Sequence, residues 1–165
     1  MANFSFDIVS EYDKSEINNV FDQAQREISN RYDFKNTSAS LEWLDSEKSG
    51  IKITGDNQYQ LDAIADIFRK KLATRGQNQK VLNTSKEPSD SNLKMTWEIP
   101  FVAGLDQEKS KKITKLLRNK FPKLKTQIQG QEVRVTGNSK DDLQAAMQTI
   151  KSQDFDFPIN FINFR

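Results

Sequence analysis

The sequence predicts an α+β protein made of two copies of a β-α-β-β-α-β unit, each with an antiparallel sheet. Alternating apolar residues mark strands, and apolar residues three or four apart mark helices; both patterns occur twice in the same order. Residues 51–55 (IKITG) also match residues 133–137 (VRVTG) at an offset of 82 positions. At this offset Leu61 matches Leu143, so the repeat extends into the following helix.

The first copy begins with a strand at residues 4–9, where apolar side chains alternate. Asp13 followed by Glu16 resembles a capping box, which predicts a helix to about Arg31. The later elements expected in this copy are strands at 39–44 and 50–54, a helix from Asp56 or Asn57 that Gly76 ends, and a short edge strand at 81–83.

The second copy follows residues 84–92 (TSKEPSDSN), which have the composition of a linker or long loop. We therefore divide the chain into units at 1–92 and 93–165. The second unit is expected to contain a strand at 94–101, a helix from Asp106 to Pro122, a hairpin of 124–128 and 133–136, a helix capped by Asn138 or Ser139, and a strand at 159–164. This order gives a four-stranded antiparallel sheet with two helices on one face, the ferredoxin-like arrangement.

The composition excludes several kinds of chemistry. The 165 residues include no Cys and no His, which removes thiolate nucleophiles, His general bases and the usual zinc ligands. We therefore expect a binding protein with no metal or cofactor rather than an enzyme. An enzyme that uses Asp7, Glu11 and Asp13 is the less favoured alternative. No long apolar run and no basic amino-terminal region occur, so we expect a cytoplasmic protein that does not enter membranes.

Charge is distributed unevenly along the chain. Residues 1–92 contain 12 Lys and Arg against 15 Asp and Glu, whereas residues 93–165 contain 13 against 8. The stretch from Lys109 to Lys125 has eight basic residues and no acidic one. It is either the solvated face of an amphipathic helix or a phosphate-binding patch of an RNA-binding or protein-interaction module. Phe121 is its single aromatic residue, which does not favour long single-stranded nucleic acid.

The segment RYDFK, from Arg31 to Lys35, combines side chains suited to a nucleotide. Arg31 and Lys35 can bind phosphate, while Tyr32 and Phe34 offer ring faces to a base. The alternative is a helix end in which both rings fill the core and Arg31 interacts with the helix dipole.

Three further basic residues are candidate phosphate contacts, namely Arg134, Lys140 and Arg165. Arg134 lies between two valines on a predicted strand, so its side chain should project from the face that the helices leave open. A cross-strand ion pair is the alternative role for Arg134. The turn before Lys140 lacks the glycine pattern of a phosphate-binding loop, so a helix cap explains that turn better.

Several segments, taken in order, resemble the YajQ family of small bacterial proteins. They are residues 5–11 (SFDIVSE), 31–35 (RYDFK), 111–113 (KKI), 127–130 (QIQG), 133–137 (VRVTG), 141–144 (DDLQ) and 160–165 (NFINFR). The resemblance runs from Phe4 to Arg165. Asn36 stands where the family often has Gly.

This resemblance implies a tandem of RNA-recognition-like ferredoxin folds whose first strands are exchanged between the two halves. It also implies nucleotide binding, with cyclic di-GMP as the ligand in some members, which act through a transcription regulator. The expected nucleotide contacts are Arg31, Lys35, Arg134, Lys140 and Arg165. They are chosen by side-chain chemistry, because the resemblance supplies no binding motif.

Overall fold

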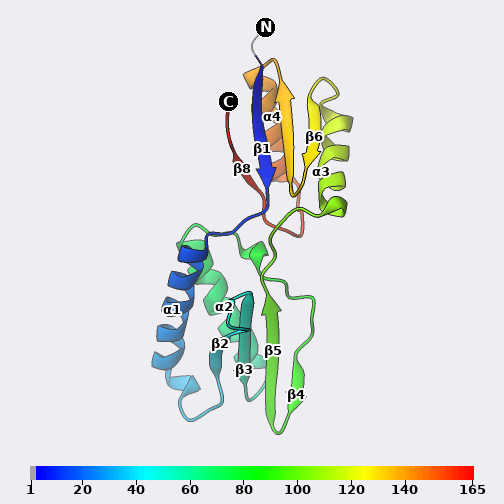
Figure 1. Ribbon diagram of the computed structural model, residues 1–165. Helices are drawn as coiled ribbons and strands as arrows, with labels where there is room; N and C mark the ends of the chain where they lie inside the picture. The colour runs from blue at the N-terminus through cyan, green and yellow to red at the C-terminus, as the bar shows by residue number, and fades with distance from the viewer. Residues whose placement is uncertain (1–2) are drawn as a thin grey trace. The chain divides into compact units, whose positions relative to one another are not determined.

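The computed structural model describes residues 3–165 and contains two four-stranded antiparallel sheets, each covered by two helices (Figure 1). This confirms the predicted α+β class with two ferredoxin-like units. Contacts divide the chain into two compact units. The α1–α2 unit is Tyr12–Val102, and the α3–α4 unit combines the residues up to Glu11 with Ala103–Arg165.

The two units contain the following elements. The α1–α2 unit holds α1 (Lys14–Asn30), β2 (Ser40–Trp43), β3 (Gly50–Gly55), α2 (Gln58–Thr74), β4 (Ser89–Ser91), β5 (Lys94–Pro100) and the 3-10 turns η1 (Tyr32–Phe34) and η2 (Gln79–Val81). The α3–α4 unit holds β1 (Phe4–Val9), α3 (Gln107–Lys120), β6 (Lys125–Gln129), β7 (Glu132–Gly137), α4 (Lys140–Ser152) and β8 (Asn160–Ile162).

The first strands of the two sequence repeats are exchanged, as the resemblance implied. The strand orders are β6-β7-β1-β8 and β2-β3-β5-β4. Phe6 and Ile8 of β1 lie opposite Val135 and Val133 of β7, and all four side chains are buried. The boundaries of the compact units, at residues 11/12 and 102/103, therefore differ from the boundary between the sequence repeats, at residues 92/93. Residues 1–92 and 93–165 remain our proposal for the extent of the duplicated units.

The α1–α2 unit has the caps that the sequence predicts. The Asp13 carboxylate accepts hydrogen bonds from the backbone N–H groups of Ser15 and Glu16, and Asn57 caps α2 in the same way. Glu16 does not complete a capping box; its carboxylate instead accepts two hydrogen bonds from Arg75, at 2.7 and 3.0 Å. The pair fixes the first turn of α1 to the end of α2.

Two segments of this unit differ from the sequence prediction. Residues 79–81 form the 3-10 turn η2 rather than an edge strand, and only Leu82 makes an isolated bridge, to Phe101. Residues 84–92 are more than a loop, because Ser89–Ser91 pair with β5 as β4. All three β4 residues are exposed, so the segment lacks the apolar alternation that marks a strand.

The core of the α3–α4 unit lies between the helices and one face of its sheet. Asp106 caps α3 and Ser139 caps α4. β8 ends at Ile162 because Asn163 adopts a left-handed backbone with φ of 57°, which inserts one extra residue before pairing resumes. Ser5 and Arg165 then exchange two backbone hydrogen bonds, of 3.2 and 3.0 Å. Within residues 3–165, no helix combines the length and the apolar character needed to cross a membrane.

Candidate functional site

The α1–α2 unit contains an open groove of about 550 Å³ between the second half of α1, the η1 turn and β2. Ile28, Phe34 and Leu41 give it an apolar floor. Three basic side chains and one carboxylate also line it, and these are Arg26, Arg31, Lys35 and Asp22. Two of the residues selected from the sequence, Arg31 and Lys35, thus lie in the same groove.

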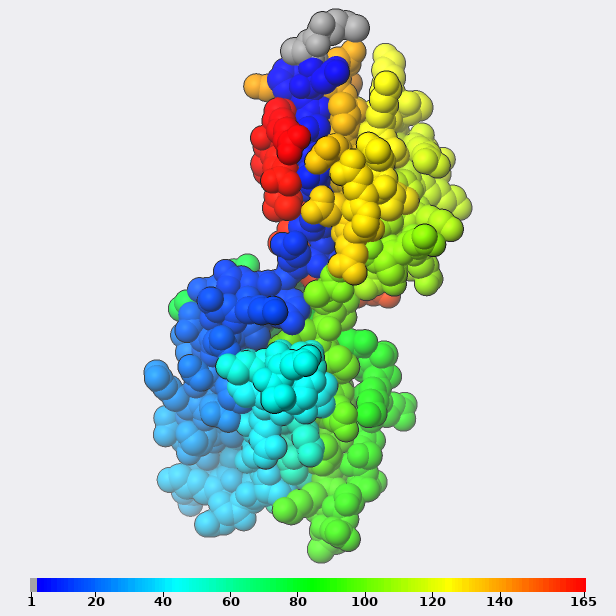
Figure 2. Space-filling view, viewed as in Figure 1, coloured from blue at the N-terminus to red at the C-terminus, as the bar shows by residue number. Residues whose placement is uncertain are grey.

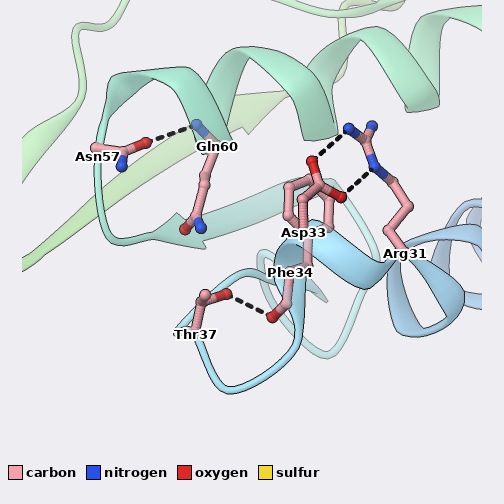
Figure 3. A network of polar contacts seen from close by, with 6 residues as sticks. All are labelled: Arg31, Asp33, Phe34, Thr37, Asn57 and Gln60. Atoms are coloured by element: carbon pink, nitrogen blue, oxygen red, sulfur yellow. Dashed lines mark hydrogen bonds and ion pairs between the residues drawn. The ribbon is translucent and has the colours of Figure 1, made fainter.

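Arg31 is held in place by its neighbours in the RYDFK segment. It ends α1 in an extended conformation, and its Nε and Nη2 atoms donate to the two carboxylate oxygens of Asp33 at 3.0 and 2.7 Å (Figure 3). The guanidinium carbon lies 4.5 Å from the centre of the Phe34 ring. The hydrogen bonds to Asp33 raise the pKa of Arg31 and lower the pKa of Asp33. The guanidinium therefore stays charged and oriented at the groove.

The turn after Arg31 separates the two rings that the sequence singled out. Phe34 is 5% exposed and packs into the core, as the helix-end alternative required. Tyr32 is 87% exposed, so the same alternative is wrong for this ring. The Lys35 Nζ atom lies 5.9 Å from the centre of the Tyr32 ring. Asn36 has φ of 61°, a left-handed backbone conformation that Gly and Asn adopt more readily than other residues.

A second group of candidate residues lies on the open face of the sheet in the α3–α4 unit. Arg134 is opposite Asp7 on the neighbouring strand, and its Nε atom donates to Asp7 Oδ1 at 2.9 Å. Asn163 Nδ2 donates to Asp7 Oδ2 at 2.8 Å. The hydrogen bond from Arg134 lowers the pKa of Asp7 most, and burial acts against it. The cross-strand ion pair considered for Arg134 is therefore present.

The structure places the other two candidates differently. Arg165 pairs with Ser5 through its backbone, and its charge also lowers the pKa of Asp7. Arg134 and Arg165 thus lie close to the same buried carboxylate. Lys140 lies elsewhere in this unit, with Nζ 5.1 Å from the centre of the Phe4 ring.

Each of the three acidic residues considered for an enzyme, Asp7, Glu11 and Asp13, makes a different contact in the structure. Asp7 accepts a hydrogen bond from Arg134, Asp13 caps α1, and the backbone N–H of Glu11 donates to Asn160 Oδ1 at 3.1 Å. Among residues 3–165, no group of three or more Asp and Glu is arranged to hold a metal ion.

Sequence reasoning missed two residues near the groove. Arg26 lies one helical turn after Asp22 on α1, and the i, i+4 spacing of these two charged residues is the sequence signal that could have indicated it. Tyr59 in the first turn of α2 is 66% exposed and lies close enough to Arg31 to raise its pKa. No local pattern connects Tyr59 with Arg31, because the contact depends on how the two helices pack.

Comparison with known proteins gives full-length matches. The family model described as "Nucleotide-binding protein YajQ-like" matches residues 4–165. A protein named "Nucleotide-binding protein" from Trichodesmium erythraeum is 42% identical over 161 residues, which cover 98% of this chain and 97% of the relative.

Two other relatives extend this similarity across distant bacteria. A "Nucleotide-binding protein" from a Nocardioides species is 43% identical over 166 residues and 100% of both chains. A relative from Proteus mirabilis with the same description is 41% identical over 161 residues and 98% of both chains. The matched region includes both units, the groove and the Asp7–Arg134 pair, and the chain belongs to the family of YajQ-like nucleotide-binding proteins.

Proposed function

We propose that this chain binds a nucleotide without catalysing its conversion, and that the nucleotide occupies the groove between α1, η1 and β2. The observation that carries the proposal is the combination of three basic side chains with an apolar floor in a groove of about 550 Å³. Small-molecule sites commonly have this size and pair apolar walls with a few charged groups. The description shared by the family model and the relatives supports the same ligand class.

Each lining group has a role that follows from its chemistry. Lys35 and Arg26 supply positive charge for phosphate groups. Arg31 uses Nε and Nη2 for Asp33, so its remaining N–H groups are the ones that would bind a phosphate or a base edge. The exposed Tyr32 ring beside Lys35 offers a surface on which a base could stack.

We further propose cyclic di-GMP as the preferred nucleotide, with the bound protein acting through a transcription regulator. The resemblance to the family supports this choice, and two phosphates per ligand suit a groove with several basic side chains. Arg134, Arg165 and Lys140 remain proposed phosphate contacts for the alternative in which the nucleotide binds to the α3–α4 unit instead of the groove. The shared position of Arg134 and Arg165 beside Asp7 supports the first two.

Isothermal titration calorimetry tests the proposal. The intact protein is titrated with cyclic di-GMP near physiological salt, with GTP and a short RNA in parallel. We expect saturable binding of cyclic di-GMP and a loss of affinity of about 10-fold or more in Lys35→Ala, because a charge-assisted contact is removed.

Lys70→Ala is the matched control, since Lys70 is an exposed lysine of the same unit outside the groove. Its affinity should equal that of the unchanged protein, and circular dichroism checks that both variants are folded. Equal affinities of Lys35→Ala and the unchanged protein for cyclic di-GMP would show that the nucleotide does not bind in the groove. Binding of GTP but not of cyclic di-GMP would be consistent with the groove as the nucleotide site and would identify GTP, rather than cyclic di-GMP, as the ligand.

A further inference from the structure

A basic surface covers the exposed side of α3 and continues into the start of β6. It consists of seven exposed side chains, Lys111, Lys112, Lys115, Arg118, Lys120, Lys123 and Lys125. None of the seven forms an ion pair with a carboxylate of residues 3–165. In Figure 2 the yellow-green and yellow segment of the chain that carries these residues forms a continuous part of the surface of its unit. The positive charge is therefore available to a partner.

Three of these side chains form a line along the helix. Lys111, Lys115 and Arg118 are four and three residues apart, which places them on one side of α3, away from the buried Ile113 and Leu117. At 1.5 Å of rise per residue, the line is roughly 10 Å long. A nucleic-acid strand advances about 3.4 Å along its axis per phosphate, so the line spans several phosphates.

Helix stability does not account for this arrangement. Arg118 and Lys120 in the last turn interact favourably with the helix dipole, but Lys111 and Lys112 lie in the half of α3 nearer its positive end. Lys111 and Lys115 are also like charges at i and i+4, which destabilise a helix. Glu108, three and four residues before Lys111 and Lys112, is the one acidic residue of α3 and offsets only part of this charge.

The surface has few groups that could bind unstacked bases, since its one aromatic residue, Phe121 between α3 and β6, is half-buried. Among residues 3–165, the exposed large apolar side chains include no aromatic residue of α3 or β6, and Ile128 is the one that lies in β6. Proteins that bind single strands stack bases on aromatic rings, whereas duplexes are held through their phosphates. We propose that the basic surface binds the phosphate backbone of double-stranded nucleic acid, without reading base sequence and independently of the nucleotide groove.

Fluorescence anisotropy tests this proposal with labelled 20-base-pair RNA and DNA duplexes and the corresponding single strands. Lys111→Gln/Lys115→Gln is compared with Lys14→Gln/Lys70→Gln, which removes the same charge from exposed positions of the α1–α2 unit. We expect duplex affinity to fall about 10-fold in the first variant at low salt. The slope of log K against log salt concentration should fall by about 2, because two phosphate contacts are lost. The control should match the unchanged protein.

Three results would overturn the inference. They are equal duplex affinity for both variants, binding that does not vary with salt, and tighter binding of polyglutamate than of duplex at equal salt. The last result would identify an acidic protein as the partner. The nucleotide proposal is tested separately, because Lys111→Gln/Lys115→Gln should bind cyclic di-GMP as the unchanged protein does, and Lys35→Ala should bind duplex normally.

Discussion

At the residue scale, the Asp7–Arg134 pair shows how a candidate binding residue can have a structural role. The Asp7 side chain is 2% exposed and the Arg134 side chain 30% exposed. A buried carboxylate needs its partners, since an unsatisfied buried polar group costs about 1–3 kcal/mol. Arg134→Ala would therefore destabilise the protein whether or not Arg134 contacts a phosphate, so a loss of ligand binding in that variant would not by itself identify a contact.

The same pair predicts how stability depends on pH. Arg134 lowers the pKa of Asp7 in the folded protein, so the unfolded chain takes up this proton at higher pH than the folded protein does. The stabilisation is complete above the unfolded pKa of about 3.9 and is lost as pH falls through the lower folded value. Urea unfolding between pH 6 and pH 2 measures this loss. Asp7→Asn should show a shallower acid dependence than the unchanged protein, and identical slopes would contradict the assignment.

At the element scale, the β4–β5 hairpin has an unfavourable turn residue. Asn92 and Leu93 have φ of 48° and 67°, the left-handed pair that a two-residue turn requires. Such turns favour Asn followed by Gly, because a side chain with a Cβ atom is strained there. Leu93 is 97% exposed, so its side chain contributes little packing in return.

Leu93→Gly should therefore stabilise the α1–α2 unit by about 0.5–1 kcal/mol, because relief of backbone strain exceeds the added freedom of glycine in the unfolded chain. Chemical denaturation followed by tryptophan fluorescence measures the change, since Trp43 and Trp97 both lie in this unit. Leu93→Ala is the matched control and should give little change, as Ala keeps the Cβ atom. A destabilised Leu93→Gly variant would contradict this explanation of the turn.

At the scale of the whole molecule, strand exchange determines which pieces of the chain can fold. Residues 1–92 lack β5, whose Trp97 and Ile99 are buried against Ile53 and Ile51. They also carry β1, whose partners β7 and β8 lie in the other repeat. A fragment of residues 12–102 contains all elements of the α1–α2 unit.

The 12–102 fragment should unfold cooperatively on heating, whereas the 1–92 fragment should show no cooperative transition, because it has lost β5, one of the two central strands of its sheet. Circular dichroism at 222 nm follows both. A cooperative transition in 1–92 with native-like helix content would contradict the importance of the exchange. Mixing 1–92 with 93–165 should restore the transition, since the two pieces together supply every strand.

The sequence predicted local features well and long-range pairing poorly. Asp13, Asn57, Asp106 and Ser139 cap helices as expected, because a cap depends on residues within one turn. β1 could have paired within either copy by its apolar pattern, and only the family resemblance implied the exchange. Likewise, 127 positions separate Asp7 from Arg134, so no local pattern connects them.

The groove was predictable only in part. Arg31 and Lys35 were found because charged and aromatic residues are adjacent in the sequence. Tyr59 was missed because it comes from α2, and only the packing of the two helices brings it near Arg31; Arg26 lies on α1 itself and was predictable from its spacing to Asp22. The spacing of the two rings also could not predict that Phe34 is buried and Tyr32 exposed, because the turn between α1 and β2 is irregular.

The central claim is that a nucleotide binds in the groove of the α1–α2 unit. Two-dimensional ¹H–¹⁵N NMR of the labelled intact protein, recorded during titration with cyclic di-GMP, tests it most directly. We predict saturable shifts of amides in the second half of α1, the η1 turn and β2, including those of Arg31 and Lys35. Shifts confined to the open sheet face around Ser5, Arg134 and Arg165 would contradict the claim and place the nucleotide in the other unit.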